Sequence, residues 1–440
     1  MGEQVAVAAA PARAPVMPSL DGTEFVLLVV PDLNGSLRGK ALRPDAFVSA
    51  VQHGAAMTDL LLALDPVDAP ISDFESFGIR SGAADLLVHP DLTTLHDLTW
   101  RTGWKICIGT THWPGGARCE LDSREVLRGA LAQMSELGYD VLAALEYEVR
   151  ISDATTKEFA SSGISYSAAE VSRLDAFVKR LNIALEALGV ELTAVHTEAA
   201  PGLLELNLAA RPALGAADDA VYTKLAAKEV AVSMGLRASF LAKTAAGEEG
   251  SSGHVHLSLW REAENAFATP RGMGSAIAGL LAHMPAASLL LNPTINSYKR
   301  LVPGWFAPTN LSWGVENRSC ALRAIVSSRP ELCRIECRRP GADANPYLAL
   351  AALVVAAVDG LRRKLEPPDA VVGDAYSRSD LASLPASLES ALAAFAADTG
   401  LREGLGQEFA SYFATSRRWE LKAWQGAVSD WERARYERSV

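Results

Sequence analysis

The chain lacks the cysteine pattern of a disulfide-bonded or zinc-binding protein. Its 440 residues include five cysteines, an odd number, and no two of them form a C-x-x-C pair. Disulfide frameworks and zinc sites usually show paired or closely spaced cysteines. We therefore expect reduced thiols in a cytoplasmic protein. The five are Cys107, Cys119, Cys320, Cys333 and Cys337.

Long hydrophobic runs and an excess of positive charge are also missing. The longest apolar run, residues 347–358, is shorter than the roughly 20 residues that a membrane-spanning helix needs, so it predicts a buried helix. Residues 1–20 are rich in alanine and proline and lack the basic start of a secretory signal, which favours a disordered tail. The formal net charge of −11 offers no basic footprint for nucleic acid. We expect neither a membrane nor a nucleic acid as partner.

Length and pattern indicate two domains and an α+β fold. A chain of 440 residues exceeds the size at which one hydrophobic core stops growing. Residues 21–117 are rich in short strands, of which 25–30, 84–88 and 104–108 are the clearest. From Asp122 the pattern changes to a capped amphipathic helix that ends at Gly138, and strands and helices then interleave. We predict a second, larger domain over residues 118–440.

Several carboxylates and two histidines occupy alternate positions in predicted strands. Glu146 and Glu148 share one strand face, and so do His254, His256 and Ser258 in a later strand. Glu198 and Glu205 lie in otherwise apolar sequence, where a buried carboxylate needs a partner. A solvated edge strand and structural histidines are the simpler alternatives, whereas a shared divalent cation would relieve the repulsion between the carboxylates.

Five arginines cluster within forty residues in the middle part of the second predicted domain. Residues 334–338 alternate so that Arg334, Glu336 and Arg338 face one way, which suits either an ion-pair ladder or an anionic ligand bridged by a metal. Residues 296–304 read as a long basic loop. The other arginines of the cluster are Arg300, Arg318 and Arg323.

Taken together, the carboxylates and arginines favour phosphoryl transfer from ATP. Five carboxylates with a histidine suit Mg²⁺ or Mn²⁺ better than zinc, and fixed positive charge suits a transferred phosphoryl group. The chain has no Walker loop, kinase glycine loop or Rossmann fingerprint. Side chains and metal ions would therefore have to hold the phosphates.

At this point the sequence resembles the glutamine synthetase family of the bacterial type. The resemblance runs from about Asp32 to Tyr436. It is carried by N-P-T-x-N-S-Y-K-R-L-V-P-G at 292–304 and by R-I-E-x-R with N-P-Y-L at 334–348, and the H-x-H-x-S-L strand and the terminal S-D-W-E agree. The resemblance implies a small β-grasp-like N-terminal domain and a larger catalytic domain with a curved antiparallel sheet and helices. It also implies a cytoplasmic homo-dodecamer of two hexameric rings with sites between subunits.

The resemblance also implies roles for individual residues, and it implies glutamate, ATP and an amine as substrates with two to three Mg²⁺ or Mn²⁺ ions per site. One metal site would consist of Glu148, Glu198 and Glu205, and a second of Glu146, His254 and Glu336. The nucleotide would contact His256, Ser258, Arg323 and Arg334. Glutamate would be held by Arg300, Arg338 and Gly250, and Arg318 would stabilise the transferred phosphoryl group.

The chain departs from this family where ammonium binds. The family carries a glutamate in the flap that follows K-R-L-V-P-G, whereas this chain reads Trp305-Phe306-Ala307-Pro308, and the family's D-G-S-S loop has no counterpart at residues 54–59. Loss of an anion and gain of apolar surface disfavour ammonium. We therefore predict γ-glutamylation of an organic amine (a polyamine, ethanolamine or another monoamine) with Trp305 and Phe306 at the amine site. An ammonia-using enzyme with a merely packing Phe306, and a non-catalytic homologue, are the alternatives.

Overall fold

The computed structural model describes residues 17–440, so most of the predicted disordered tail lies outside the described residues. A small sheet near the N-terminus has the strand order β2-β1-β6-β4-β3, with β5 paired to β6. β1 and β6 run parallel, and the remaining neighbours are antiparallel. The strands are β1 (Phe25–Pro31), β2 (Leu37–Leu42), β3 (Ala55–Thr58), β4 (Asp85–Pro90), β5 (His96–Asp97) and β6 (Trp104–His112).

Both faces of this small sheet are apolar. On one face Val26, Leu28 and Val30 pack against Phe47 and Ala50 of α1 (Pro44–His53). On the other face Val29, Ile106 and Ile108 belong to the hydrophobic core that extends through the rest of the chain. Because this core is continuous, the small sheet is fixed against the larger unit. The exact domain boundary at 117/118 stays a prediction.

A ten-stranded sheet forms the centre of the molecule, with the order β14-β15-β16-β12-β7-β9-β8. β10 and β11 also pair with β7, and β13 pairs with β12. The predicted antiparallel sheet is largely confirmed, but β14 and β15 run parallel, so the sheet is mixed. The strands are β7 (Asp140–Asp153), β8 (Leu192–Thr197), β9 (Leu203–Leu208), β10 (Arg211–Pro212), β11 (Leu236–Ser239), β12 (Gly253–Arg261), β13 (Glu264–Asn265), β14 (Trp313–Val315), β15 (Leu322–Ile325) and β16 (Arg334–Cys337).

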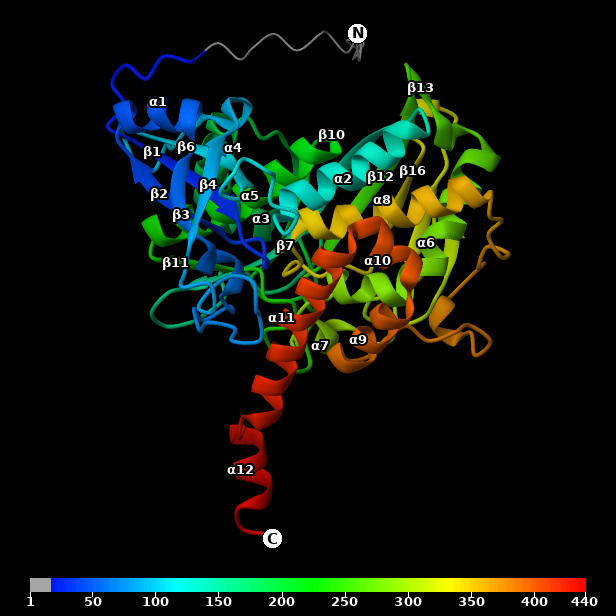
Figure 1. Cartoon of the computed structure of the whole chain (residues 1–440). Helices are drawn as coiled ribbons and strands as arrows, with labels where there is room; N and C mark the ends of the chain where they lie inside the picture. Colours follow the sequence, from blue (N-terminus) through cyan, green and yellow to red (C-terminus); the bar gives the residue numbers. More distant parts are fainter. Residues whose placement is uncertain (1–16) are drawn as a thin grey trace.

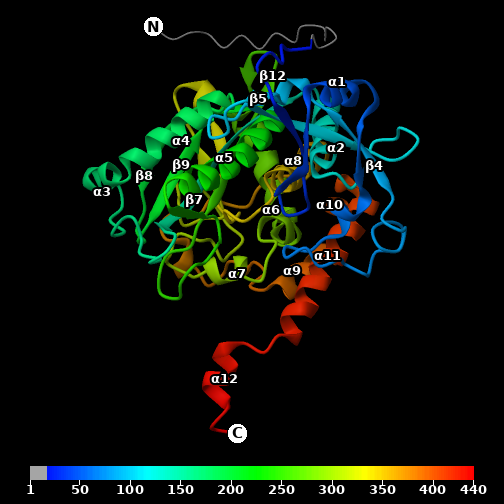
Figure 2. The ribbon, with the colours of Figure 1, turned by 90° about the vertical axis from the view of Figure 1, so that its left-hand side faces the viewer.

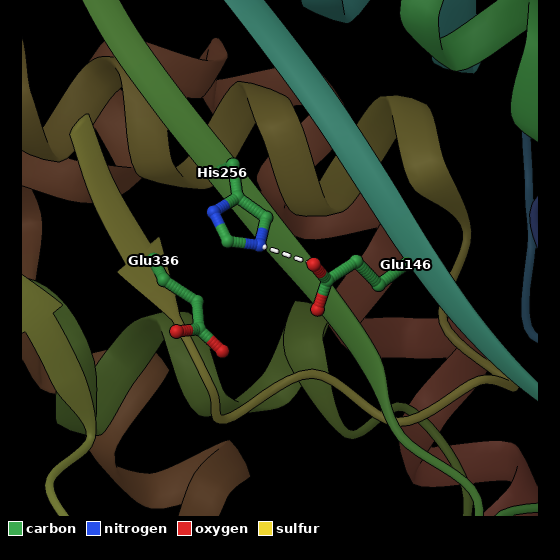
Figure 3. Close-up of side chains that lie close together, drawn as sticks. All are labelled: Glu146, His256 and Glu336. Atoms are coloured by element: carbon green, nitrogen blue, oxygen red, sulfur yellow. Dashed lines mark ion pairs between the residues drawn. The ribbon is translucent and has the colours of Figure 1, made fainter. Parts of the chain in front are cut away.

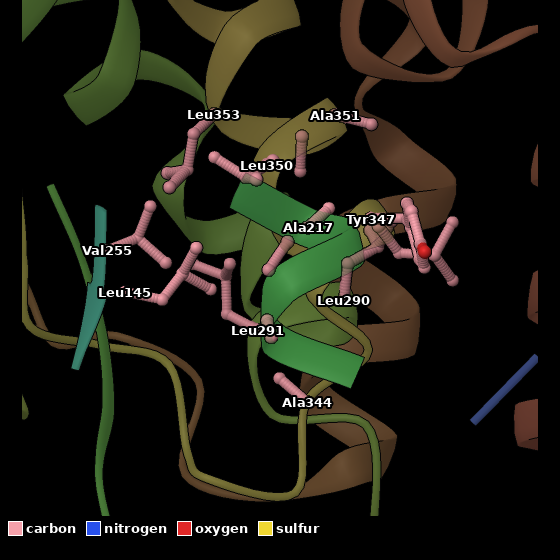
Figure 4. Packing of buried hydrophobic residues seen from close by; sticks show 14 of the residues in the cluster. Leu145, Ala217, Val255, Leu290, Leu291, Ala344, Tyr347, Leu350, Ala351 and Leu353 are labelled. Atoms are coloured by element: carbon pink, nitrogen blue, oxygen red, sulfur yellow. The ribbon is translucent and has the colours of Figure 1, made fainter. Parts of the chain in front are cut away.

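Helices cover one face of the large sheet (Figures 1 and 2). Leu145 of β7 and Val255 of β12 point toward Leu291 and Leu350 from two of these helices (Figure 4). Beyond α1 the helices are α2 (Ser123–Glu136), α3 (Ala168–Arg173), α4 (Asp175–Ala187), α5 (Ala213–Ser233), α6 (Pro270–Leu291), α7 (Ser297–Arg300), α8 (Pro346–Arg363), α9 (Leu388–Ala397), α10 (Thr399–Leu405), α11 (Gln407–Gly426) and α12 (Asp430–Tyr436). Of these, α12 extends away from the sheet at the C-terminal end (Figure 1).

Local sequence signals explain where several helices begin. The Asp122 side chain accepts a hydrogen bond from the Arg124 amide at 2.8 Å, so the predicted cap of α2 is confirmed. The predicted apolar helix is α8, which the Asn345 side chain caps and which has proline in its first turn. The prediction that residues 296–304 form a basic loop is partly wrong, because residues 297–300 form the single helical turn α7.

Among residues 17–440, one helix is long and apolar enough to cross a membrane by length and composition alone, namely α6 over Arg271–Leu291. In the structure 78% of its most apolar window is buried inside the chain. It packs chiefly on α8 and α9. The core helix of a folded domain meets the same criterion, and α6 occupies that place here.

His283 on α6 joins three helical elements through two carboxylates. Its Nδ1 lies 2.7 Å from Asp398 Oδ2, before α10, and its Nε2 lies 3.1 Å from Asp359 Oδ2 on α8, where Arg363 also pairs with Asp359. Burial alone would lower the pKa of His283, but the two carboxylates outweigh burial and the pKa is raised. The charged imidazole therefore stabilises the folded state.

We expect this contribution to stability to be complete below the unfolded-state pKa of about 6.5 and to disappear as the pH rises through the higher folded-state value. His283→Gln keeps a polar side chain but cannot titrate. Thermal unfolding measured from pH 5.5 to pH 9 should show a smaller fall in Tm for the variant than for the wild-type chain. Parallel curves for the two proteins would contradict this assignment.

Candidate active site

The polar residues predicted to act together lie on neighbouring strands of the large sheet, in register. His254 on β12 is opposite Glu146 on β7, and His256 is opposite Glu336 on β16. Further along the sheet, Glu148 on β7 is opposite Glu205 on β9, and Arg323 on β15 is opposite Glu336. Strand pairing therefore places side chains far apart in sequence within one row.

The alternation of β7 separates this row from the core. Val141, Ala143, Leu145, Tyr147 and Val149 are buried among the helices. Glu146 and Glu148 have the opposite parity and so point to the other face. The same strand thus provides core packing on one side and carboxylates on the other, as the sequence pattern predicted.

A cavity of about 560 Å³ opens over this polar face. All six predicted metal ligands line it, so they lie around one cavity, and their role as metal ligands stays a prediction. They are joined there by predicted residues of every other group, so the flap, three of the five arginines and the carboxylates meet in one pocket. The predicted residues in its wall are Glu146, Glu148, Glu198, Glu205, Gly250, His254, Trp305, Phe306, Arg318, Arg323, Glu336 and Arg338.

Glu336 is the central buried charge of the pocket, with a side chain that is 1% exposed. One oxygen lies 3.0 Å from Arg323 Nη1, and the other forms an ion pair with Arg338. Burial opposes ionisation, but the charge of Arg338 lowers the pKa of Glu336 to about 2. Figure 3 shows Glu336 and His256 on adjacent strands. Glu146 Oε1 lies 2.9 Å from His256 Nε2.

The pKa values of Glu148 and Glu205 are raised, whereas that of Glu336 is lowered. Burial, and next the charge of Glu205, raises the pKa of Glu148 to about 8. Burial, and next the charge of Glu146, raises the pKa of Glu205 to about 7. Each carboxylate is thus held in a dry, negatively charged environment. A divalent cation would favour their ionised forms, because it supplies the missing opposite charge.

The donor set fits divalent cations. His254 Nε2 is buried without a hydrogen-bond partner among residues 17–440. Oxygen ligands outnumber nitrogen ligands, which is the preference of Mg²⁺ and Mn²⁺. Three groups of side chains have ligand atoms within 4.8 Å of one another: Glu146 with His256 and Glu336, Glu146 with Glu205 and His254, and His196 with Glu198 and Glu205. These groups overlap the two predicted triplets without reproducing them, so the assignment of ligands to individual ions stays a prediction.

Arg300 does not line the pocket. Its side chain is buried, and Nη2 donates to the carbonyl oxygens of Arg339 at 2.8 Å and Pro340 at 2.6 Å. Within the described chain its Nε and Nη1 have no hydrogen-bond partner. Because Arg300 is not among the residues that line the cavity, its contact with glutamate stays a prediction.

The predicted nucleotide residues divide into two sets. Arg323 faces the pocket, whereas His256, Ser258 and Arg334 lie beyond its wall. Arg334 Nε lies 3.2 Å from His256 Nδ1, and the Ser258 hydroxyl accepts from Trp260 Nε1 at 2.9 Å. These contacts extend the polar row toward one end of β12. Their role in binding ATP stays a prediction.

Eight residues of the pocket wall had no role in the sequence-based prediction, and four of them carry an aromatic ring, an amide or a carboxylate. Tyr166, with its backbone at φ +53°, stacks on the His196 ring with centroids 4.2 Å apart. His196 Nε2 lies 2.8 Å from Glu198, and Asn207 Nδ2 donates to Glu205 at 2.8 Å. The fourth is Glu249. Tyr166 and Glu249 come from irregular segments that carry no periodic signal, whereas His196, two residues before Glu198, could have been found.

Comparison with known proteins defines the class. Residues 120–436 match the family model described as glutamine synthetase, catalytic domain. The chain belongs to the glutamine synthetase family, which uses divalent metals and ATP, and is an ATP-dependent glutamate ligase of that family. The predicted family and fold class are thereby confirmed.

Individual relatives include enzymes named for amines and for glutamine. A glutamate–isopropylamine ligase from Pseudomonas sp is 34% identical over 92% of this chain and 93% of its own length. A γ-glutamylethanolamide synthetase from Streptomyces coelicolor is 33% identical over 94% and 93%, and a glutamine synthetase from Thermotoga maritima is 32% identical over 94% and 97%. A solved structure titled "Apo GmaS without ligand" is 27% identical, with a TM-score of 0.84 over 95% of this chain and 97% of that one.

Proposed function

We propose that this chain joins the γ-carboxyl group of glutamate to an organic amine and forms a γ-glutamylamide. Glutamate would attack the γ-phosphorus of ATP to give γ-glutamyl phosphate and ADP. The amine nitrogen would then form a bond to the carbonyl carbon of the γ-carboxyl group, the bond from that carbon to the phosphate oxygen would break so that phosphate leaves, and the nitrogen would lose one proton. Bound divalent cations would supply charge neutralisation between the carboxylate and the polyphosphate.

The observation that carries the amine assignment is the aromatic flap. Trp305 and Phe306 line the same cavity as the carboxylates and Arg318. Phe306 has φ +50° and is 55% exposed, so its ring is available to a ligand rather than committed to the core. An aromatic ring cannot pair with ammonium as the family's flap glutamate does, but it can contact the carbon skeleton of an amine.

Contacts with Lys243 hold the flap residue Trp305 in a defined position. Lys243 Nζ lies 4.0 Å from the centroid of the Trp305 ring, a cation–π distance. The backbone of Lys243 is in turn held by the Asn296 side chain, which accepts from the Lys243 amide at 2.8 Å and donates to its carbonyl at 2.9 Å. Asn296 precedes α7, so Lys243 links the start of the segment that carries the flap to Trp305 within it.

The arginines supply the positive charge that phosphoryl transfer needs. Arg318 and Arg338 line the cavity beside the carboxylates. We infer that Arg318 meets the charge on the transferred phosphoryl group and that Arg338 contacts glutamate. Two stacked hexameric rings, a cytoplasmic location and the use of either Mg²⁺ or Mn²⁺ belong to the same proposal and follow from the family resemblance.

The test is phosphate release with glutamate and ATP, in which ammonium is compared with putrescine, spermidine, ethanolamine, isopropylamine and methylamine. We expect at least one organic amine to give a higher kcat/KM than ammonium. Phe306→Glu restores an anion to the flap, and it should raise kcat/KM for ammonium by about tenfold while lowering it for the preferred amine. Ammonium as the best substrate of the wild-type chain would refute the amine assignment.

A further inference from the structure

A second cavity, of about 530 Å³, lies between α5, β11 and the turn that joins β1 to β2. It shares no lining residue with the cavity over the large sheet. Segments of the small sheet and of the larger unit therefore meet around it, and the proposed reaction does not use it. Its charged lining residues are Lys224 and Lys228 of α5, Arg237 of β11, and Asp343.

The three basic side chains of this cavity have no carboxylate partner. Among residues 17–440, no carboxylate oxygen lies within 4.0 Å of a charged nitrogen of Lys224, Lys228 or Arg237. Within the same part of the chain, Lys228 and Arg237 donate no side-chain hydrogen bond. The cavity thus holds cationic groups that the protein itself does not neutralise.

The two lysines are four residues apart on α5, so both project from one side of the helix. Like charges at this spacing destabilise a helix. Lys224 Nζ donates to the Ala344 carbonyl oxygen at 2.8 Å and lies 4.6 Å from the centroid of the Tyr147 ring. Burial lowers the pKa of Lys224 to about 7, Asp343 opposes that shift and Lys228 adds to it. An anion in the cavity would offset both the burial and the repulsion.

Asp343 is the one carboxylate in the lining of this cavity. Its Oδ2 accepts hydrogen bonds from the Thr294 hydroxyl at 2.9 Å and from the Ser297 hydroxyl at 2.6 Å. Asp343 is therefore engaged by the segment that leads into α7, and it forms no ion pair with the lysines. Positive charge exceeds negative charge around the cavity.

This arrangement suits a phosphate group. Two ammonium groups and a guanidinium can donate together to the several oxygens of one phosphate, and charge-assisted contacts of this kind are the strong ones. The hydroxyl groups of Ser36 and Ser239 line the same cavity. Much of the remaining lining is apolar, and the volume is within the range of small-molecule sites, so a carbon skeleton can be accommodated beside the phosphate.

We propose that this second cavity binds a phosphate group, either as free phosphate or as part of a small organic molecule, between Lys224, Lys228 and Arg237. The ligand would join the β1–β2 turn of the small sheet to α5 and β11 of the larger unit. The assignment does not depend on the proposed function. Phosphate is a product of the proposed reaction, however, so the experiment must separate this cavity from the active site.

Lys228→Gln and Arg237→Gln each remove one charge from an exposed residue, and Arg180→Gln on the exposed side of α4 is the matched control. Calorimetric titration of the full chain with inorganic phosphate, without divalent cations, gives the dissociation constant. We expect each single variant to weaken binding by about threefold to tenfold and the double variant by more than about tenfold. Arg180→Gln should bind as the wild-type chain does. Arg318→Gln changes the active site alone, and it should retain this binding.

Hydrogen exchange followed by mass spectrometry locates the bound phosphate. Phosphate should slow exchange in residues 34–37 and 236–239 of the wild-type chain and of Arg180→Gln, but not in the double variant. Glycerol 3-phosphate distinguishes the two sources, because tighter binding than that of inorganic phosphate identifies an organic phosphate as the ligand. Protection confined to segments of the active site, or equal phosphate binding by the wild-type chain and the double variant, would overturn the assignment. Failure of the amine assignment would leave all these readouts unchanged.

Discussion

Replacement of Glu336 by glutamine should lower kcat by roughly a hundredfold to a thousandfold, the effect typical of removing one preorganised charge from an active site. The substitution removes the negative charge that lies between Arg323, at 3.0 Å, and Arg338. It also removes a predicted metal ligand that is 1% exposed. Both effects weaken the binding of a cation and leave two guanidinium groups facing each other across a neutral side chain.

The same substitution should destabilise the fold by about 3 kcal/mol or more, because an uncompensated buried charge is left behind. Activity should therefore be measured well below the Tm of the variant, with Mg²⁺ titrated at each temperature. Glu331→Gln is the matched control, since Glu331 pairs with Arg329 at 2.8 Å on the surface and does not reach the cavity. A Glu336→Gln chain with wild-type kcat and wild-type Mg²⁺ dependence would show that the pocket does not act as proposed.

Replacement of Asp218 by alanine should cause the largest loss of stability without any direct contact with substrate. Asp218 on α5 accepts two hydrogen bonds from Arg124, at 2.9 and 2.8 Å, and a third from the Tyr347 hydroxyl at 2.6 Å. The Arg124 side chain is 2% exposed. Its remaining carboxylate partner, Asp91, is 2.9 Å away. These contacts join α2, α5 and α8 at the centre of the helical layer.

We expect a destabilisation of about 3–5 kcal/mol for Asp218→Ala, because breaking a buried pair leaves the arginine partly unpaired. Thermal and urea unfolding would measure it. Asp175→Ala is the control, since Asp175 pairs with Lys179 on the surface of α4 at spacing i, i+4 and should contribute only about 0.3–0.5 kcal/mol. Equal effects of the two substitutions would contradict the central role of the buried network.

Much of the fold could be predicted because its signals are local. The alternation in residues 141–149 places apolar side chains on one face of β7 and two glutamates on the other. The Asp122 cap, the apolar run of α8 and the Ser429–Glu432 capping box of α12 each depend on neighbours within a few residues. The basic segment before the flap was misjudged because its single turn, α7, is too short to show helical periodicity.

The site could be predicted as a set of residues but not as a geometry. The sequence pattern and the family resemblance identified six carboxylate and histidine positions, and all of them line one cavity. The hydrogen bonds that hold the Arg300 guanidinium could not be foreseen, because the carbonyl oxygens that accept them belong to residues 339 and 340. The stacking of Tyr166 on His196 likewise joins a loop to a strand thirty residues away.

The sequence alone determined the chemical types in the site, because alternation along a strand and the composition of short motifs are written in neighbouring residues. It also determined the aromatic flap at 305–306 and thereby the case for an organic amine. Only the tertiary structure decided which charges are neutralised by protein and which remain for a ligand. Glu248 and Glu249 are adjacent and chemically identical, yet one meets Arg150 and the other faces the cavity, since the position of Arg150 depends on how β7 lies beside the loop between β11 and β12.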